Sequence, residues 1–383
     1  MAAAMSDERR LKILAKLAQD GDLLRLRREL DRGGGPEREL ARRRLGSSGD
    51  TLLHHAARGG HPETLRYLLD ELGAPPELCN GDYKRALHEA AAAGHAGCVA
   101  LLLRAGADVD SLKRADWTPL MMSCTRRNLQ VIELLLEGGA DPSLTNKDGW
   151  SAFHIACREG DSRVIQRLLL ANADLWRTES KTRRTPLHTA AMHGCEDVVR
   201  ILLDRCGMVG QYKTDMFDSC GVTPFMDALR QGHVSIAELL LNGHQASPVA
   251  ADVLGLQPLH QVCITGQERA LRYLVEVLGV NVNSKATDMQ LTGLHYAAKE
   301  GHTGCVKTLV MLGVELDAKD RKGRSALHMA SIGQRPETVA VLLTLGLEDS
   351  PDASGVTAAQ LARTHLTQQA FQRQGPCPPS TSS

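Results

Sequence analysis

Short blocks of apolar and small residues recur along the chain, and within each block they have the spacing of a single helix face. The block at residues 185–194 reads TPLHTAAMHG, and a second apolar stretch follows it at 198–203. Thr is a good N-cap, Pro fits a first helical turn, and Gly tolerates the left-handed conformation that ends a helix. The pattern therefore predicts pairs of short helices joined by tight turns.

The blocks are separated by nearly constant distances. The His of each block, or the Met that replaces it, recurs in steps of 34, 33, 33, 34, 38, 34, 35 and 33 residues. These markers are His54, His88, Met121, His154, His188, Met226, His260, His295 and His328. The motif and its period resemble the ankyrin repeat. The resemblance implies an all-α solenoid of about nine helix-turn-helix repeats with short β-turn fingers.

The ends of such an array should differ from its middle, because one repeat cannot bury its own apolar face. We expect N-terminal capping helices and a linker at 1–48, the repeat array at 49–365, and a disordered tail at 366–383 that ends in a Pro- and Ser-rich stretch. The 38-residue step indicates an insertion at 207–218. A tolerated loop is favoured there over a functional one.

Composition limits the classes of ligand and the cellular compartments that are expected for this chain. The formal net charge is zero, which argues against a nucleic-acid or anionic membrane ligand for the chain as a whole. No apolar run is long enough to span a membrane, and the N-terminus lacks the apolar core of a secretory signal. The ten cysteines include no CxxC pair, which indicates a reducing compartment. We expect cytoplasmic residence, with the nucleus as a second compartment.

Histidines recur once or twice per repeat and not on adjacent turns of one helix. This spacing lacks the HExxH and paired-Cys patterns of zinc sites, so we interpret these histidines as hydrogen-bonding residues and expect no metal. Nucleotide-binding and nucleophile motifs such as GxSxG are also absent. We therefore expect no cofactor, no catalytic residues and no enzyme activity.

A band of aromatic and basic residues covers the fingers of consecutive repeats. Trp, Tyr and Arg are the residue types enriched in binding hot spots, and ankyrin fingers and first helices line a concave face. The sequence predicts a partner-binding surface made of Tyr83, Lys84, Arg85, Arg114, Trp117, Arg126, Arg127, Trp150, Arg158, Trp176, Arg177 and Arg184. The alternative is that each Trp packs finger against finger, with the basic residues solvated.

Sequence segments that depart from the repeat consensus support a resemblance to one particular ankyrin family. ADWTPLMM at 115–122, NKDGW at 146–150 and HYAAKEGH at 295–302 are similar to the ankyrin repeat domain-containing protein 16 family of vertebrates. That resemblance implies a protein that binds the catalytic domain of alanyl-tRNA synthetase, and we expect the chain to be monomeric on its own. It also implies that lysine side chains accept serine which the synthetase has wrongly activated. Such a protein supports translation fidelity as a stoichiometric acceptor.

The matched acceptor positions carry only one lysine. They fall on Lys147, Arg114 and Arg177. Arginine keeps its proton at neutral pH and cannot act as the nucleophile. Acyl capture is therefore assigned to Lys147, with Lys113 and Lys181 as assisting acceptors.

Two other functions stay open. One is a generic ankyrin adaptor, for example one that delivers substrates to a ubiquitin ligase, although no ligase-recruiting box follows Leu361. The other is a tRNA-contacting factor that uses the basic band. Direct nucleic-acid binding is not expected at zero net charge, and a steep salt dependence of RNA affinity would indicate it.

Overall fold

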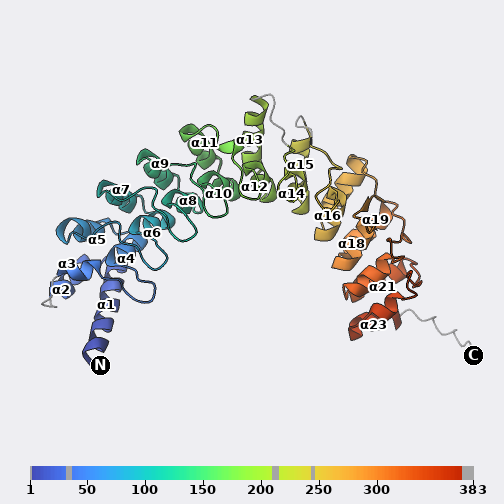
Figure 1. The fold of residues 1–383 in the computed structure, drawn as a ribbon, viewed down its shortest axis with the longest axis horizontal. Coiled ribbons are helices and arrows are strands. Elements are labelled where there is room, and N and C mark those ends of the chain that lie inside the picture. The colour runs from blue at the N-terminus through green and yellow to red at the C-terminus, as the bar shows by residue number, and fades with distance from the viewer. Residues whose placement is uncertain (1, 32–36, 209–214, 243–245, 373–383) are drawn as a thin grey trace, which may run out of the picture. The chain divides into compact units, whose positions relative to one another are not determined.

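The computed structural model describes residues 2–31, 37–208, 215–242 and 246–372. The chain divides into two compact units, residues 1–186 and 187–383. Both units consist of short helices arranged in pairs (Figure 1).

Unit 1 begins with three helices and continues with four helix pairs. The helices are α1 (Ala2–Asp20), α2 (Leu23–Asp31), α3 (Glu37–Arg42), α4 (Leu52–Gly59), α5 (Pro62–Arg66) with the π-helical turn η1 (Tyr67–Glu71), α6 (Ala86–Ala93), α7 (Ala96–Arg104), α8 (Pro119–Cys124), α9 (Leu129–Glu137), α10 (Ala152–Glu159), α11 (Ser162–Ala171) and the 3-10 turn η2 (Leu175–Arg177). The first helices α4, α6, α8 and α10 pack side by side, and α5, α7, α9 and α11 form a second row.

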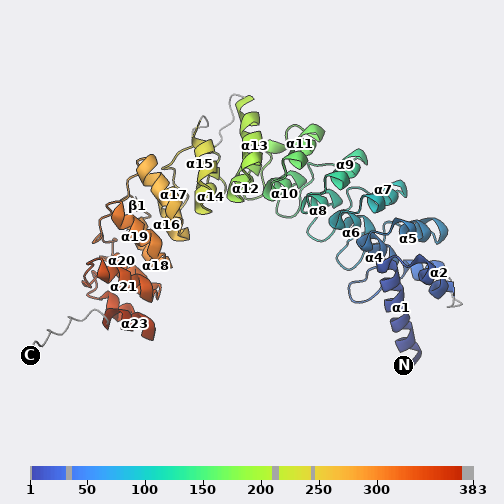
Figure 2. The same ribbon diagram turned by 180° about the vertical axis from the view of Figure 1, so that it is seen from behind.

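Unit 2 repeats this arrangement and is seen from the other side in Figure 2. Its elements are α12 (Pro186–Met192), α13 (Glu196–Met208), α14 (Pro224–Arg230), α15 (Val234–Leu241), α16 (Pro258–Thr265), α17 (Glu268–Arg272) with the π-helical turn η3 (Tyr273–Val277), β1 (Lys285–Ala286), β2 (Leu291–Thr292), α18 (Gly293–Glu300), α19 (Thr303–Met311), α20 (Ala326–Ile332), α21 (Pro336–Thr344), α22 (Ala358–Leu361) and α23 (His365–Gln372). The two short strands pair antiparallel within one finger.

The core lies between the two helix rows of each unit. Leu87, Ala90 and Ala91 of α6 are buried together with Val99 and Leu102 of α7. Small alanines let neighbouring first helices approach closely, and each fully buried Leu contributes roughly 1.5–3 kcal/mol. Stacking therefore supplies the burial that an isolated repeat lacks.

Helix ends follow from the sequence motif. Thr118 Oγ1 accepts the backbone N–H of Met121 at 3.2 Å, and Pro119 occupies the first turn of α8. Gly160 ends α10 with φ of 80°, a left-handed value that favours glycine. Local chemistry thus fixes the start of α8 and the end of α10.

Where a repeat has the motif histidine, that residue links it to the next repeat. The Thr51 N–H donates to His54 Nδ1 at 3.1 Å, so Nε2 carries the proton and donates to the Lys84 carbonyl at 2.8 Å. Equivalent bonds of 2.8–3.2 Å to the following finger are made by His54, His88, His154, His188, His295 and His328. Over the described ranges, no group of three His, Cys, Asp or Glu side chains is arranged to hold a metal ion.

The predicted all-α repeat architecture is confirmed, but the predicted tail at 366–383 is wrong in its first part. Residues His365–Gln372 form α23, which packs on α21 and buries Thr367 and Ala370. This helix covers the last repeat, as a cap must. Residues 373–383, and 209–214 of the predicted insertion, lie outside the described residues. Within the described part, no helix has both the length and the apolarity to cross a bilayer.

Candidate protein-binding surface

The fingers of unit 1 are five-residue turns that precede a first helix. They comprise 80–84, 113–117, 146–150 and 180–184. In each finger the backbone N–H of the first residue donates to the carbonyl of the fifth, at 2.9–3.0 Å. The five positions of one finger are therefore equivalent to those of the next, and they can be compared directly.

Successive fingers are joined by one backbone hydrogen bond. The N–H of the second position donates to the third-position carbonyl of the preceding finger, from Arg114 to Asp82 at 2.8 Å, from Lys147 to Ala115 at 3.0 Å, and from Lys181 to Asp148 at 3.1 Å. We call Arg114, Lys147 and Lys181 the fingertip row. All three side chains are exposed, so the main chain presents three cations at equivalent places.

Aromatic residues accompany the fingertip row. Trp117 and Trp150 hold the fifth position of their fingers and are partly exposed, while Tyr83 is 62% exposed at a fourth position. The Lys113 Nζ lies 5.2 Å from the centre of the Trp117 ring. The structure thus brings the predicted Tyr83, Trp117 and Trp150 together with basic side chains on one side of unit 1.

Trp176 does not belong to this group, which corrects the sequence interpretation. It lies in η2 at the base of its finger and is only 4% exposed. The Arg177 guanidinium lies over its ring at 4.7 Å and pairs with Asp174 at 3.8 Å, so Arg177 is also outside the fingertip row. The sequence prediction groups Trp176 with Trp117 and Trp150 because all three are tryptophans, but Trp176 does not occupy the fifth position of its finger. Arg184 holds the fifth position instead.

Lys84 and Arg85 neutralise carboxylates within the scaffold. Arg58 bridges the buried Asp50 and Glu89 at 2.8 and 3.0 Å, and the Lys84 Nζ lies 3.3 Å from Glu89 Oε1. Burial alone would raise the pKa of Glu89, but its partners outweigh burial and lower it. Arg85 pairs with Glu77 at 2.6 Å. These two residues therefore support the fingers as well as lining them.

The remaining predicted arginines lie at the ends of first helices. Arg126 and Arg127 follow α8 and are exposed. Arg127 and Arg158 both approach Glu159, at 3.8 and 2.8 Å. They form a second basic cluster at the C-terminal ends of the first helices, with one carboxylate shared between two guanidinium groups.

The finger 113–117 differs from its neighbours in its closure. Asn80 and Asn146 use their side-chain oxygens to accept two finger N–H groups each, at 2.9–3.0 Å. Lys113 has no such acceptor, and its finger has two consecutive left-handed residues, Ala115 and Asp116, with φ of 64° and 61°. Burial lowers the pKa of the Lys113 ammonium, and nearby Lys84 lowers it further.

Known proteins share the repeat pattern. A family model described as Ankyrin repeats (3 copies) matches residues 1–113, 53–146, 87–179, 120–209, 153–252, 206–286, 242–320 and 294–368. The chain is 25% identical over 229 residues to ankyrin repeat protein nuc-2 of Neurospora crassa, which covers 52% of this chain and 20% of that protein.

Two further relatives belong to different classes of protein, a cation channel and a probable ubiquitin ligase. Transient receptor potential cation channel subfamily A member 1 of Drosophila melanogaster is 27% identical over 168 residues, covering 42% of this chain and 14% of the channel. The probable E3 ubiquitin-protein ligase XBOS33 of Oryza sativa subsp. japonica is 29% identical over 174 residues, covering 35% of this chain and 32% of the ligase. The chain spans at most a third of each relative, so the similarity concerns the repeats.

Proposed function

We propose a specific function on the premise that this chain belongs to the ankyrin repeat family, whose model matches it across residues 1–368. Its general role is that of a protein-binding scaffold. The narrower proposal is that it binds the catalytic domain of alanyl-tRNA synthetase and accepts misactivated serine on lysine side chains. The observation that supports this proposal is the fingertip row, with Trp117 and Trp150 on the same fingers.

The proposed capture step is an acyl transfer. A deprotonated lysine Nζ attacks the carbonyl carbon of seryl-adenylate, an amide bond forms, AMP leaves, and the amine proton passes to solvent. An ordinary lysine with a pKa near 10.4 has well under about 1% free amine at neutral pH. Holding the amine beside the adenylate compensates through its high effective concentration. The synthetase supplies the adenylate from serine and ATP.

The basic side chains would have different roles in this step. Lys147 is the matched acceptor, and Lys181 occupies the equivalent place on the next finger. Lys113 is the residue whose lowered pKa favours the free amine. Arg114 in the same row keeps its proton and can contribute charge but not an acyl bond. The exposed fingertip positions favour Lys147 and Lys181 as acceptors. The η2 turn contains no lysine, so it offers no acceptor.

The test is a pull-down with the synthetase catalytic domain in serine and ATP, followed by mass spectrometry of lysine adducts. We expect a seryl adduct on Lys147, lost in Lys147→Arg while binding persists. Lys322→Arg, on a finger of unit 2, is the matched control and should change nothing. Absence of binding, or undiminished total seryl-lysine in Lys147→Arg, would contradict the proposal.

Two other candidate functions predict different binding partners in a pull-down from cell extract or a titration with tRNA. An adaptor for a ubiquitin ligase is supported by the similarity to the rice relative named as a probable ligase. It would recover ligase subunits and no synthetase. A tRNA-contacting factor would bind tRNA alone, with an affinity that falls steeply with salt.

A further inference from the structure

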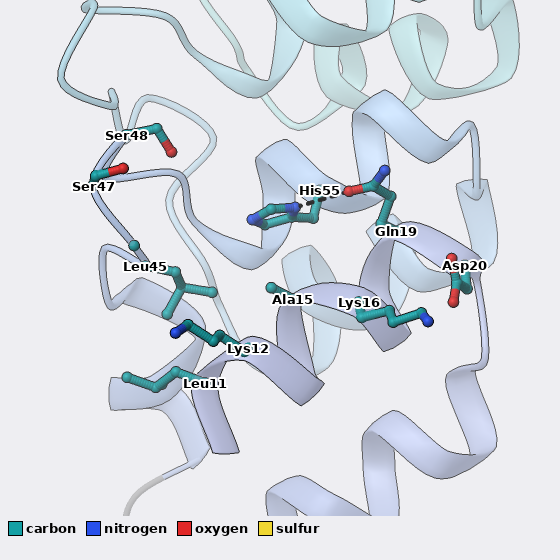
Figure 3. A pocket seen from close by; sticks show the side chains of 11 residues that line it. Leu11, Lys12, Ala15, Lys16, Gln19, Asp20, Leu45, Ser47, Ser48 and His55 are labelled. Carbon is teal, nitrogen blue, oxygen red and sulfur yellow. Dashed lines mark hydrogen bonds between the residues drawn. The ribbon is translucent and has the colours of Figure 1, made fainter. Parts of the chain in front are cut away.

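A hollow of about 460 Å³ lies between α1, the start of α4 and the loop 45–48 (Figure 3). We call it the α1 pocket. It lies within unit 1 but outside the predicted partner-binding residues. Its volume is within the range of pockets that hold small ligands or a few side chains.

The floor of the α1 pocket is apolar. Ala15 of α1 lies at its centre, with Leu11 beside it and the buried Leu45 on the opposite wall (Figure 3). The alanine methyl leaves the hollow open, because a larger side chain at this position would extend into it. An apolar side chain from another molecule would therefore be removed from water here.

The rim of the α1 pocket is polar and mainly cationic. Lys12 and Lys16 are four residues apart on α1, so they lie on the same helix face and flank Ala15. The hydroxyl-bearing Ser47 and Ser48 stand on the loop wall. Asp20 is the one carboxylate among the lining residues. The rim therefore suits an acidic group next to an apolar one.

The pocket is continuous with the fingers. The Gly81 N–H donates to the Ser48 carbonyl at 2.8 Å, which extends the same finger-to-finger bond found at Arg114, Lys147 and Lys181. A chain segment that follows the fingers toward the N-terminus reaches the α1 pocket next. Position thus favours a peptide of a bound protein over a free small molecule.

We propose that the α1 pocket binds a short acidic segment of a partner protein, with an aliphatic side chain on Ala15 and Leu45 and a neighbouring carboxylate at Lys12 and Lys16. The proposal uses the scaffold role of the chain but not the identity of the synthetase. Direct peptide binding therefore tests it independently of serine capture.

The probe is the fluorescein-labelled peptide Glu-Leu-Glu-Glu, titrated with the full chain and followed by fluorescence anisotropy. We expect saturation with a Kd below about 1 mM. Replacing the peptide's leucine with glycine, or its glutamates with lysines, should weaken binding at least about tenfold, because each removes one half of the recognition.

Two variants locate the binding. Ala15→Trp should fill the hollow, and Lys12→Glu combined with Lys16→Glu should repel the peptide, each with a loss of at least about tenfold. Both lysines are exposed, so the second variant stays folded even if Ala15→Trp does not. Lys322→Glu is the charge control and should bind normally. No saturable binding, or equal binding by the wild type and the double variant, would overturn the proposal.

Discussion

At the scale of single residues, the first position of a finger decides how the turn is closed. Asn146 accepts the N–H groups of Asp148 and Trp150, each at 2.9 Å. Lys113 cannot do so, and Ala115 and Asp116 adopt left-handed conformations that cost of order 1 kcal/mol each outside glycine. The central finger of the binding surface is therefore held at a local cost in stability.

Exchanging the two residue types should show this cost. Lys113→Asn should raise the free energy of unfolding by about 1 kcal/mol, because finger N–H groups gain an acceptor. Asn146→Lys should lower it by about 1–2 kcal/mol. Urea denaturation followed by circular dichroism measures both, and an Asn146→Lys protein as stable as wild type would show that the side chain does not close the turn.

Replacing each of the three tryptophans should change the free energy of unfolding by different amounts. Trp176→Ala should lower the free energy of unfolding by about 3–5 kcal/mol, because it leaves a cavity at a buried site. Trp117→Ala and Trp150→Ala should each cost about 1 kcal/mol, because both residues are partly exposed. Binding tests should therefore use Trp117 and Trp150 only. Equal costs at all three sites would contradict the placement of Trp176.

At the scale of helices, the motif predicts where first helices begin and end, but spacing does not show where an extra residue goes. The steps from His54 to His88 and from His154 to His188 are both 34 residues. The first extra residue widens a helix, where the Leu72 N–H donates to the Tyr67 carbonyl in a π-turn. The second extra residue is placed just before a finger, at Glu179. Trp176 stands 12 residues before His188, whereas Trp117 and Trp150 stand four residues before Met121 and His154, so it was never equivalent to them.

The last helix shows a second limit of sequence pattern. The segment that forms α23 buries Thr367 and Ala370 and begins after Thr364, whose Oγ1 accepts the Thr367 N–H at 3.3 Å, but it leaves Leu366 exposed. Its stability comes from packing on α21, which local sequence does not reveal. The fingertip row was likewise only partly predicted, since its equivalences depend on hydrogen bonds between repeats.

The histidines that link repeats should make stability depend on pH. Burial lowers the pKa of His88 and His154 from about 6.5 to about 4. Between those values the unfolded chain binds more protons than the folded one, so stability falls as the pH drops from 6.5 to 4. Each of these two histidines should contribute a loss of up to roughly 3 kcal/mol at the lower end.

Urea midpoints at pH 7, 5.5 and 4.5 would measure this effect. Met121 holds the same position in its repeat, so His154→Met is a conservative control. That variant should be less stable at pH 7 but should lose less stability on acidification. An unchanged dependence on pH would show that His154 does not titrate between the folded and unfolded states.

At the scale of the whole chain, fingers at equivalent places differ in chemistry. Unit 1 carries the cations Arg114, Lys147 and Lys181, whereas in unit 2 one fingertip carries the exposed Arg321 and another carries Val253 and Leu254, which are 70% and 65% exposed. A chain with no net charge can still carry basic and apolar contact sites on different fingers. Composition alone could not separate them.

This contrast predicts how partner binding responds to salt. Binding through the unit 1 fingers should weaken severalfold between low and high ionic strength, because exposed charges are screened beyond about 10 Å at 0.1 M salt. Calorimetric titration of the synthetase domain at several salt concentrations measures this. Replacing both Val253 and Leu254 with serine should leave the salt dependence unaltered. Affinity that does not change with salt would place the main contact elsewhere.

The bond between fingers joins main-chain atoms only, and this has an evolutionary consequence. The N–H groups of Arg114, Lys147 and Lys181 donate to carbonyls of the preceding fingers, and these bonds keep the fingers in register whatever side chains the three residues carry. Mutation can therefore alter recognition one finger at a time, and the inherited scaffold tolerates each change. Proline is the exception, because it lacks the N–H that keeps a finger attached to its neighbour. Selection for a new partner should therefore change these positions freely and exclude proline from them.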